Sequence, residues 1–185
     1  VGLAFSHKYK EEPNVCLTYL GDGAVNQGQV YESFNMAALW SLPCLFIIEN
    51  NQYGMGTAVT RAAAGRDLAD RGMAYGIPGK QVDGMDVLAV RNAALEALAH
   101  CREGNGPYIL EMKTYRYRGH SMSDPAKYRT REEVDAMRKQ HDPIDQLRDV
   151  LMKQDMTEAA LKTIDSDVKA IVTKATEFAQ TSPEP

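Results

Sequence analysis

Short runs of consecutive hydrophobic residues alternate along the chain with stretches in which hydrophobic residues recur every three or four positions. The runs Val15–Leu20, Cys44–Ile48 and Tyr108–Met112 are typical of buried strands, and Lys80–Val82 predicts a shorter one. These strands are apolar on both faces, as expected for a parallel sheet that helices cover on both sides.

Helical spacing fills the intervals between these runs. One predicted helix has its apolar residues at spacings of four, three and one, on Val30, Phe34, Ala37 and Ala38. A short helix is expected over Asp67–Tyr75, and an Ala- and Leu-rich helix over Val87–Cys101. The alternation of strands and helices predicts an α/β fold, with a mostly parallel sheet and helices on both faces.

The pattern changes after the third long run. Residues Arg116–Arg131 are polar and basic and predict a loop, and the residues that follow predict mostly helices. The last helix has apolar residues three and four positions apart: Leu161, Ile164, Val168, Ile171, Ala175 and Phe178. Such a stripe packs either on its own domain or on a partner chain, and both alternatives stay open. We predict an α/β domain over residues 1–140 and a helical C-terminal extension of the same domain over 141–185.

Composition narrows the class of protein. A chain of 185 residues suits one domain with a substantial core. Its 21 basic and 25 acidic residues give a net charge of −4 without a basic stripe, so nucleic acid and membrane surfaces are not expected partners. Cys16, Cys44 and Cys101 have neither CxxC nor zinc-ligand spacing, which favours buried thiols in a reduced compartment. Because the chain begins with Val1 instead of Met, we expect a piece of a longer protein.

Two polar loops follow predicted strands. Gly21–Gly23 carries Asp22 after the first strand, and Asn50–Gly54 follows the second. Asp22 and Asn51 are 51 − 22 = 29 residues apart, the length of one helix plus one strand, so both loops can lie at the same edge of a parallel sheet. A carboxylate, an amide oxygen and a backbone carbonyl suit Mg²⁺, which completes its octahedron with phosphate oxygens and water.

Each loop alone is typical of an ordinary turn, and the two together in this order are the stronger signal. The N–H groups of Gly23 and Ala24 precede the next predicted helix, where a diphosphate could bind. Gly23 also allows a ligand to approach the backbone closely.

The resemblance to a known family covers nearly the whole chain. Two segments carry it, GDGAVNQGQVYESFNMAALWSLPCLFIIENNQYGMGT and TYRYRGHSMSDP. They resemble the alpha subunits of bacterial-type pyruvate dehydrogenases, within the thiamine diphosphate-dependent 2-oxo acid dehydrogenase family. The stretch after Ser121 is shorter than in mitochondrial members and lacks their second serine, so Ser121 is expected to be a plain loop residue and not a phosphorylation switch.

The resemblance implies the cofactors thiamine diphosphate and Mg²⁺. It implies metal ligands at Asp22, Asn51 and the backbone carbonyl of Tyr53, with the diphosphate bordered by Gly23, Ala24 and Gly54. It also implies a catalytic role for His120, in a loop over the reactive end of the cofactor, where an imidazole can donate to the substrate carboxylate or exchange a proton. Arg116 and Arg118 either pair with a phosphate or carboxylate or are solvated.

The implied activity is oxidative decarboxylation of pyruvate with acetyl transfer to lipoamide, yielding acetyl-CoA in the complex. Implied partners are a beta subunit in an α₂β₂ assembly, which supplies the glutamate that activates the aminopyrimidine, and the dihydrolipoyl acetyltransferase component. The expected location is the bacterial cytoplasm, or the mitochondrial matrix in a eukaryote. The alternative substrates are acetoin and a branched 2-oxo acid. A non-catalytic Mg²⁺–nucleotide module is disfavoured, since GxxxxGK[ST] is absent from the sequence.

Overall fold

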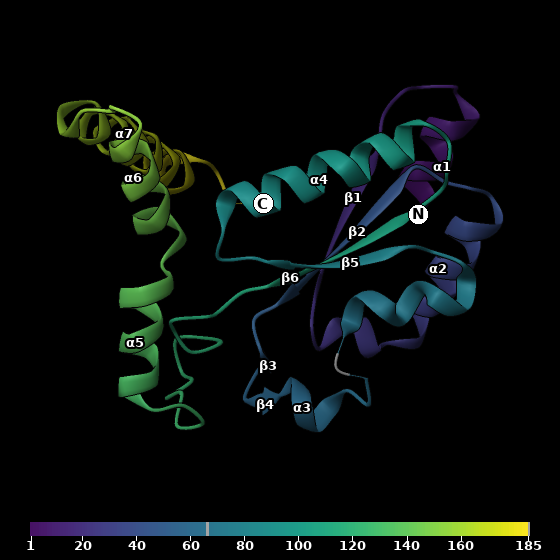
Figure 1. Cartoon of the computed structure of the whole chain (residues 1–185), viewed down its shortest axis with the longest axis horizontal. Helices are drawn as coiled ribbons and strands as arrows, with labels where there is room; N and C mark the ends of the chain where they lie inside the picture. Colours follow the sequence, from purple (N-terminus) through teal and green to yellow (C-terminus); the bar gives the residue numbers. More distant parts are fainter. Residues whose placement is uncertain (66, 185) are drawn as a thin grey trace. The chain divides into compact units, whose positions relative to one another are not determined.

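Four parallel strands form the central sheet in the computed structural model, which describes residues 1–65 and 67–184 (Figure 1). Their order in the sheet is β1 (Cys16–Gly21), β2 (Cys44–Asn50), β6 (Tyr108–Lys113) and β5 (Gly79–Asp83). Each predicted strand is confirmed, with ends that differ by at most two residues. Six of the seven residues of β2 are buried, as expected for a strand covered on both faces.

Helices cover the two faces of this sheet. On one face, Phe46 of β2 packs against Phe34 of α2 (Gly28–Leu39), with ring centroids 4.8 Å apart in an edge-to-face arrangement. On the other, Leu45 and Ile47 pack with small residues of α4 (Val87–Arg102), namely Ala93 and Ala97. α2 and α4 accordingly lie on opposite sides of the sheet in Figure 1. The α/β fold with helices on both faces is thus confirmed.

Local capping explains where several helices begin. Asp86 precedes α4 and accepts from the backbone N–H groups of Leu88 and Ala89, at 2.9 and 3.0 Å. Thr130 caps α5 (Arg131–His141) in the same way, by accepting from Glu133 N at 3.1 Å. Such caps satisfy N–H groups that have no partner within the helix.

Several elements differ from the sequence-based expectation. The predicted helix at Asp67–Tyr75 is a 3-10 helix, η2 (Leu68–Tyr75), and a 3-10 turn, η1 (Ala24–Asn26), separates the Asp22 loop from α2. The chain also contains elements that were not predicted: α1 (Gly2–Tyr9), the two-residue strands β3 (Tyr53–Gly54) and β4 (Thr57–Ala58), and α3 (Val59–Ala62). Elements of two to four residues are too short to show a hydrophobic period.

The chain divides into two units, Val1–Asp142 and Pro143–Pro185, which are described separately. The second contains α6 (Pro143–Lys153) and α7 (Glu158–Thr181), which carries the predicted apolar stripe. In α7 only Leu161 is buried, and Ile164, Val168, Ile171 and Phe178 are exposed. What the stripe packs against therefore stays open. No helix in the described ranges is long and apolar enough to cross a membrane.

The predicted division into residues 1–140 and 141–185 stays a prediction. Arg66, inside the first range, and Pro185, at the end of the second, lie outside the described residues. Cys44 and Cys101 are buried free thiols, as expected, and burial raises the pKa of each to about 11. Cys16 is partly buried and is also free.

We predict that Gly79→Ala destabilises the fold. A Cβ at this position would lie 2.1 Å from the backbone oxygen of Ala69, so β5 and η2 would have to separate. The free energy of unfolding should fall by about 1–3 kcal/mol, the usual cost of overpacking, as measured by urea denaturation. Gly28→Ala is the matched control, because a Cβ there has no neighbour within 4 Å. Equal midpoints for the two variants would contradict the close packing of β5 on η2.

Candidate functional site

The Asp22 loop and the Asn51 loop touch through their glycines. A Cβ built on Gly54 would lie 3.4 Å from the Cα of Gly23 and 3.8 Å from Oδ2 of Asp22. Both loops leave the carboxyl ends of neighbouring parallel strands, β1 and β2. A side chain at either glycine would extend toward the backbone of the other loop, so glycine at both positions lets the two loops lie close together.

Asp22 is a buried carboxyl group, with 3% of the residue exposed. Burial raises its pKa, and the opposing effects of the Asn51 backbone N–H and the Arg116 guanidinium are smaller. Within residues 1–65 and 67–184, Asp22 forms no salt bridge. A cation bound beside it would balance its charge and reverse the pKa shift.

Asn51 and Tyr53 lie in a tight, irregular segment. The Oδ1 atom of Asn51 accepts from Tyr53 N at 3.4 Å, and Gln52 between them has a positive φ of 76°. A positive φ is uncommon at residues other than glycine. Where it does occur, it is often at a ligand site. The internal hydrogen bond of Asn51 is long, so the amide oxygen remains available to a metal ion.

Arg116 contacts the same segment and changes its electrostatics. Its Nη1 donates to the backbone oxygen of Tyr53 at 3.4 Å, and its Nη2 to that of Met55 at 2.6 Å. A guanidinium therefore faces the carbonyl that was predicted to bind Mg²⁺. Of the three predicted metal ligands, the Tyr53 carbonyl is the poorest fit, because a cation there would share it with a positive charge.

The N–H groups predicted to face a diphosphate belong to the turn that follows Asp22. Gly23 is the N-cap residue of η1, and Ala24 begins it. α2 starts only at Gly28, with Gln27 as its N-cap residue, so Gly23 and Ala24 do not directly precede the long helix as the sequence indicated. The first N–H groups of such a turn have no carbonyl partner within it.

The loop that carries His120 is ordered by Asp124. Its carboxylate accepts from His120 N at 2.7 Å, from the Tyr128 hydroxyl at 2.7 Å and from Ala126 N at 2.9 Å. These bonds, first among them the one from His120 N, lower the pKa of Asp124 to about 2. The Tyr128 hydroxyl in turn accepts from Nη2 of Arg116 at 2.8 Å. The His120 loop is thereby joined to the Asn51 loop through Arg116.

The His120 side chain is exposed, and its Nδ1 lies 3.4 Å from Nη1 of Arg116. The predicted catalytic group is thus close to the guanidinium that contacts Tyr53. Ser121, the next residue, is exposed, and its hydroxyl lies 3.1 Å from that of Ser123.

Arg129 is a buried cation that was not foreseen from the sequence. Its guanidinium lies 5.2–5.7 Å from the ring centroids of Tyr53, Tyr115 and Tyr128. Its Nη1 donates to the backbone oxygen of Arg116, and its Nη2 to that of Arg118 at 2.9 Å. Arg129 therefore holds the backbone of residues 116–118 in the His120 loop and also contacts the Tyr53 ring of the Asn51 loop.

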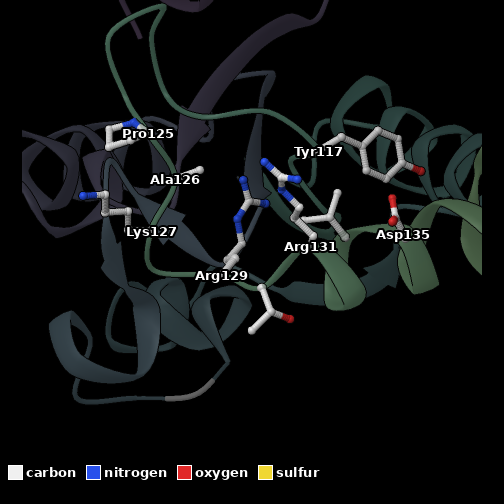
Figure 2. Close-up of a pocket in the computed structure, with 9 residues that line it drawn as sticks. Tyr117, Pro125, Ala126, Lys127, Arg129, Arg131 and Asp135 are labelled. Carbon is white, nitrogen blue, oxygen red and sulfur yellow. The ribbon is translucent and has the colours of Figure 1, made fainter.

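A pocket of about 360 Å³ lies beside this loop, at the start of α5 (Figure 2). The side chains of Arg129 and Arg131 stand between Lys127 on one side and Tyr117 and Asp135 on the other. None of the residues predicted to bind the cofactor lines it. The candidate site is thus defined by the converging loops and not by this pocket.

The described part of the chain contains no group of three or more His, Cys, Asp or Glu side chains that could hold a metal ion. A cation bound by the two loops would have Asp22 as its one carboxylate and would need oxygen ligands from elsewhere. That donor set fits Mg²⁺ bound to a diphosphate, since Mg²⁺ keeps few protein ligands in such sites.

Residues 1–185 match the dehydrogenase E1 component family. Since the match covers the whole chain and the site has the features described above, the chain belongs to this family, which depends on thiamine diphosphate.

Curated relatives agree with the family match. The chain is 61% identical over 185 residues to the "Pyruvate dehydrogenase E1 component subunit alpha" of Rhizobium meliloti, covering all of this chain and 53% of the relative. It is 55% identical over 184 residues to the protein of the same name in Zymomonas mobilis, with 52% of that protein covered. A mitochondrial relative from Sminthopsis macroura is 54% identical over 187 residues, with 51% covered. The chain spans about half the length of the curated relatives it matches.

We predict opposite effects of Asp22→Asn on stability and on ligand binding. Because burial raises the pKa of Asp22, its ionised form is less stable in the folded chain than in the unfolded one, and this cost appears as pH rises through that pKa. Without metal, the variant should therefore melt at the same or a higher temperature above that pH. Mg²⁺-dependent affinity for thiamine diphosphate should fall more than about 100-fold, since loss of outer-shell partners alone costs 10–100-fold.

Calorimetric titration with and without Mg²⁺ measures this affinity, and a thermal melt of the metal-free protein measures the stability. Retained affinity in the variant would show that Asp22 is not a metal ligand.

We predict that Asp124→Asn loosens the His120 loop. The amide keeps one acceptor oxygen but turns an NH₂ group toward N–H and O–H donors that now reach the carboxylate. Hydrogen exchange at His120 N and Ala126 N should accelerate about tenfold, the scale expected for a lost hydrogen bond. Lys127→Ala, an exposed change in the same loop, is the control and should leave these rates unchanged.

Proposed function

We propose that the chain supplies the magnesium- and diphosphate-binding half of a thiamine diphosphate site in the alpha subunit of a pyruvate dehydrogenase. The observation that carries the proposal is the contact of the Gly23 and Gly54 backbones beside the buried carboxyl group of Asp22. It joins two loops that both offer oxygen ligands, one a carboxylate and the other amide and carbonyl oxygens. The names of the relatives support the choice of enzyme.

In this proposal, Asp22 and the side-chain oxygen of Asn51 bind Mg²⁺. The Tyr53 carbonyl is the third protein ligand and the weakest, because it is shared with Arg116. Gly23, Ala24 and Gly54 border the diphosphate, where small residues leave room for its oxygens. When bound, thiamine diphosphate supplies the electron sink for decarboxylation. This chain positions the cofactor and balances its charge.

His120 is proposed to act on the substrate side. Its exposed imidazole, held near Arg116 by the Asp124 bonds, can donate to a substrate carboxylate or exchange a proton near neutral pH. The neighbouring guanidinium also attracts an anionic substrate. This effect depends on the order of residues 116–130.

The proposed assembly is supported by the names of the relatives, which are those of an alpha subunit. A beta subunit, in an α₂β₂ assembly, would supply the acid–base group for the aminopyrimidine. The acetyl group would pass to lipoamide on the dihydrolipoyl acetyltransferase component. Relatives come from bacteria and from mitochondria, so we propose the bacterial cytoplasm or the mitochondrial matrix as the compartment.

We predict that the full-length protein with its beta partner reduces an artificial electron acceptor when given pyruvate, thiamine diphosphate and Mg²⁺. The value of kcat/KM should be highest for pyruvate among pyruvate, acetoin and 2-oxoisovalerate. A higher value for either of the other two would assign the chain to a sister enzyme. Binding of ATP or GTP without thiamine diphosphate would indicate a nucleotide-binding module instead.

The role of His120 is tested in the same assay. His120→Gln should lower kcat/KM by about 10²–10⁴, the usual contribution of a general acid–base group. His141→Gln is the control, because His141 is exposed at the end of α5. Equal activity of the two variants would remove His120 from the mechanism.

A further inference from the structure

A fully buried carboxyl group lies on one face of the sheet and is not one of the predicted metal ligands. Glu111 is in β6 and is 0% exposed. Side chains alternate along a strand, so Glu111 points to the same face as Ile109, which belongs to the apolar cluster with Phe34 and Phe46. Burial of a charge in such surroundings is costly unless hydrogen bonds compensate for lost water. A specific set of partners must therefore stabilise it.

Four N–H groups contact this carboxylate. Oε1 accepts from Nδ2 of Asn50 at 2.7 Å. Oε2 accepts from the backbone nitrogens of Leu68 and Ala69, at 2.8 and 3.1 Å, and from Nε2 of Gln81 at 3.1 Å. Every partner is a donor, so Glu111 serves as an acceptor on both oxygens.

One of these four bonds leads to the Asn51 loop. Asn50, whose amide nitrogen donates to Glu111, uses its Oδ1 to accept from Gln52 N at 3.1 Å. Gln52 has the positive φ and lies between Asn51 and Tyr53, both predicted metal ligands. The Asn50 amide thus links Glu111 to the backbone of that loop through one hydrogen bond on each side.

The other oxygen leads to the Asp22 loop. The bonds to Leu68 N and Ala69 N fix the start of η2. From η2, Arg71 donates to the Tyr31 hydroxyl and, through Nη2, to Oδ1 of Asn26 at 3.1 Å. Asn26 completes the path by donating from Nδ2 to the backbone oxygen of Asp22 at 3.4 Å.

We propose that Glu111 is a positioning residue that holds the two loops of the half-site in register before magnesium and the diphosphate bind. The inference rests on the proposed function, since it assigns a purpose to the loops that Glu111 joins. Glu111 contacts neither ligand in this proposal and acts through Asn50 on one side and through η2 on the other.

Glu111→Gln tests the first path with little change of shape. With its oxygen kept toward Leu68 N and Ala69 N, the new amide would turn its NH₂ group toward the Asn50 NH₂ group, and a flip of the Asn50 amide would only move the conflict to Gln52 N. With the opposite orientation, the new NH₂ group would face the N–H groups of Leu68 and Ala69 instead. Every arrangement of the single variant therefore loses at least one of these bonds. In the double variant Asn50→Asp, Glu111→Gln, the carboxylate and the amide have exchanged strands, so all of these bonds can form again with the same total charge.

The measurement is Mg²⁺-dependent binding of thiamine diphosphate to the full-length alpha chain assembled with its beta partner. Glu111→Gln should weaken the affinity by about 10–100-fold, as found for residues that orient metal ligands. The double variant should recover most of the affinity that Glu111→Gln loses. Leu110→Ala is the matched control, because Leu110 is equally buried but belongs to the opposite cluster. It should lower the melting temperature without weakening the cofactor affinity.

A milder variant covers the case in which Glu111→Gln does not fold. Arg71→Gln breaks the second path at a partly exposed residue and leaves the core intact. It should weaken cofactor affinity at an unchanged melting temperature, and unchanged affinity would overturn the coupling through η2.

The outcomes separate the two proposals. If the unmodified complex binds thiamine diphosphate with Mg²⁺ and Glu111→Gln binds it equally well, Glu111 has no positioning role and the proposed function stands. Failure of the double variant to recover affinity has the same meaning. If the unmodified complex shows no Mg²⁺-dependent binding, both proposals are wrong.

Discussion

Parallel strands end at one edge of their sheet, and the candidate site depends on that constraint. In β2 the buried residues are apolar from Cys44 to Ile48, and the polar residue Asn50 appears only at the end of the strand. Asp22 and Asn51 are the first residues beyond the ends of β1 and β2, and the contact of Gly23 with Gly54 brings their loops together. The packing of the two sheet faces is therefore also what brings the oxygen ligands to one place.

The two carboxyl groups near this edge have opposite pKa shifts. Asp22 is enclosed and its pKa is raised by burial, whereas Asp124 is held by donors and its pKa is lowered to about 2. Arg116 lies between them and contacts carbonyl oxygens of the Asn51 loop. A bound cation would favour the first carboxylate and repel the guanidinium, so ligand binding and the position of the His120 loop are expected to affect each other.

The sequence predicts the frame of this fold better than its connections. Continuous apolar runs such as Cys44–Ile48 can only be buried, so the strands and their parallel arrangement followed directly. The hairpin of β3 and β4 was missed because two residues show no alternation, and Arg129 was missed because its cage forms from Tyr53, Tyr115 and Tyr128 only after folding.

The role of Glu111 could not be predicted from the sequence either, because its partners are distant along the chain. A single glutamate in an apolar strand gives no local signal, and its partners Asn50 and Leu68 are 61 and 43 residues away. Gly79, whose close approach packs β5 on η2, is equally indistinct in the sequence.

The enclosure of Arg129 has a consequence for the effect of salt. Mobile ions screen charges that face solvent, such as the exposed pair Lys162 and Glu158. They screen the Arg129 guanidinium much less, because this residue is only 9% exposed and is surrounded by aromatic rings. The attachment of the His120 loop to the Asn51 loop should therefore persist at ionic strengths that weaken the surface ion pairs. As ionic strength rises, the His120 loop would keep its conformation while the exposed ion pair of α7 loses part of its strength.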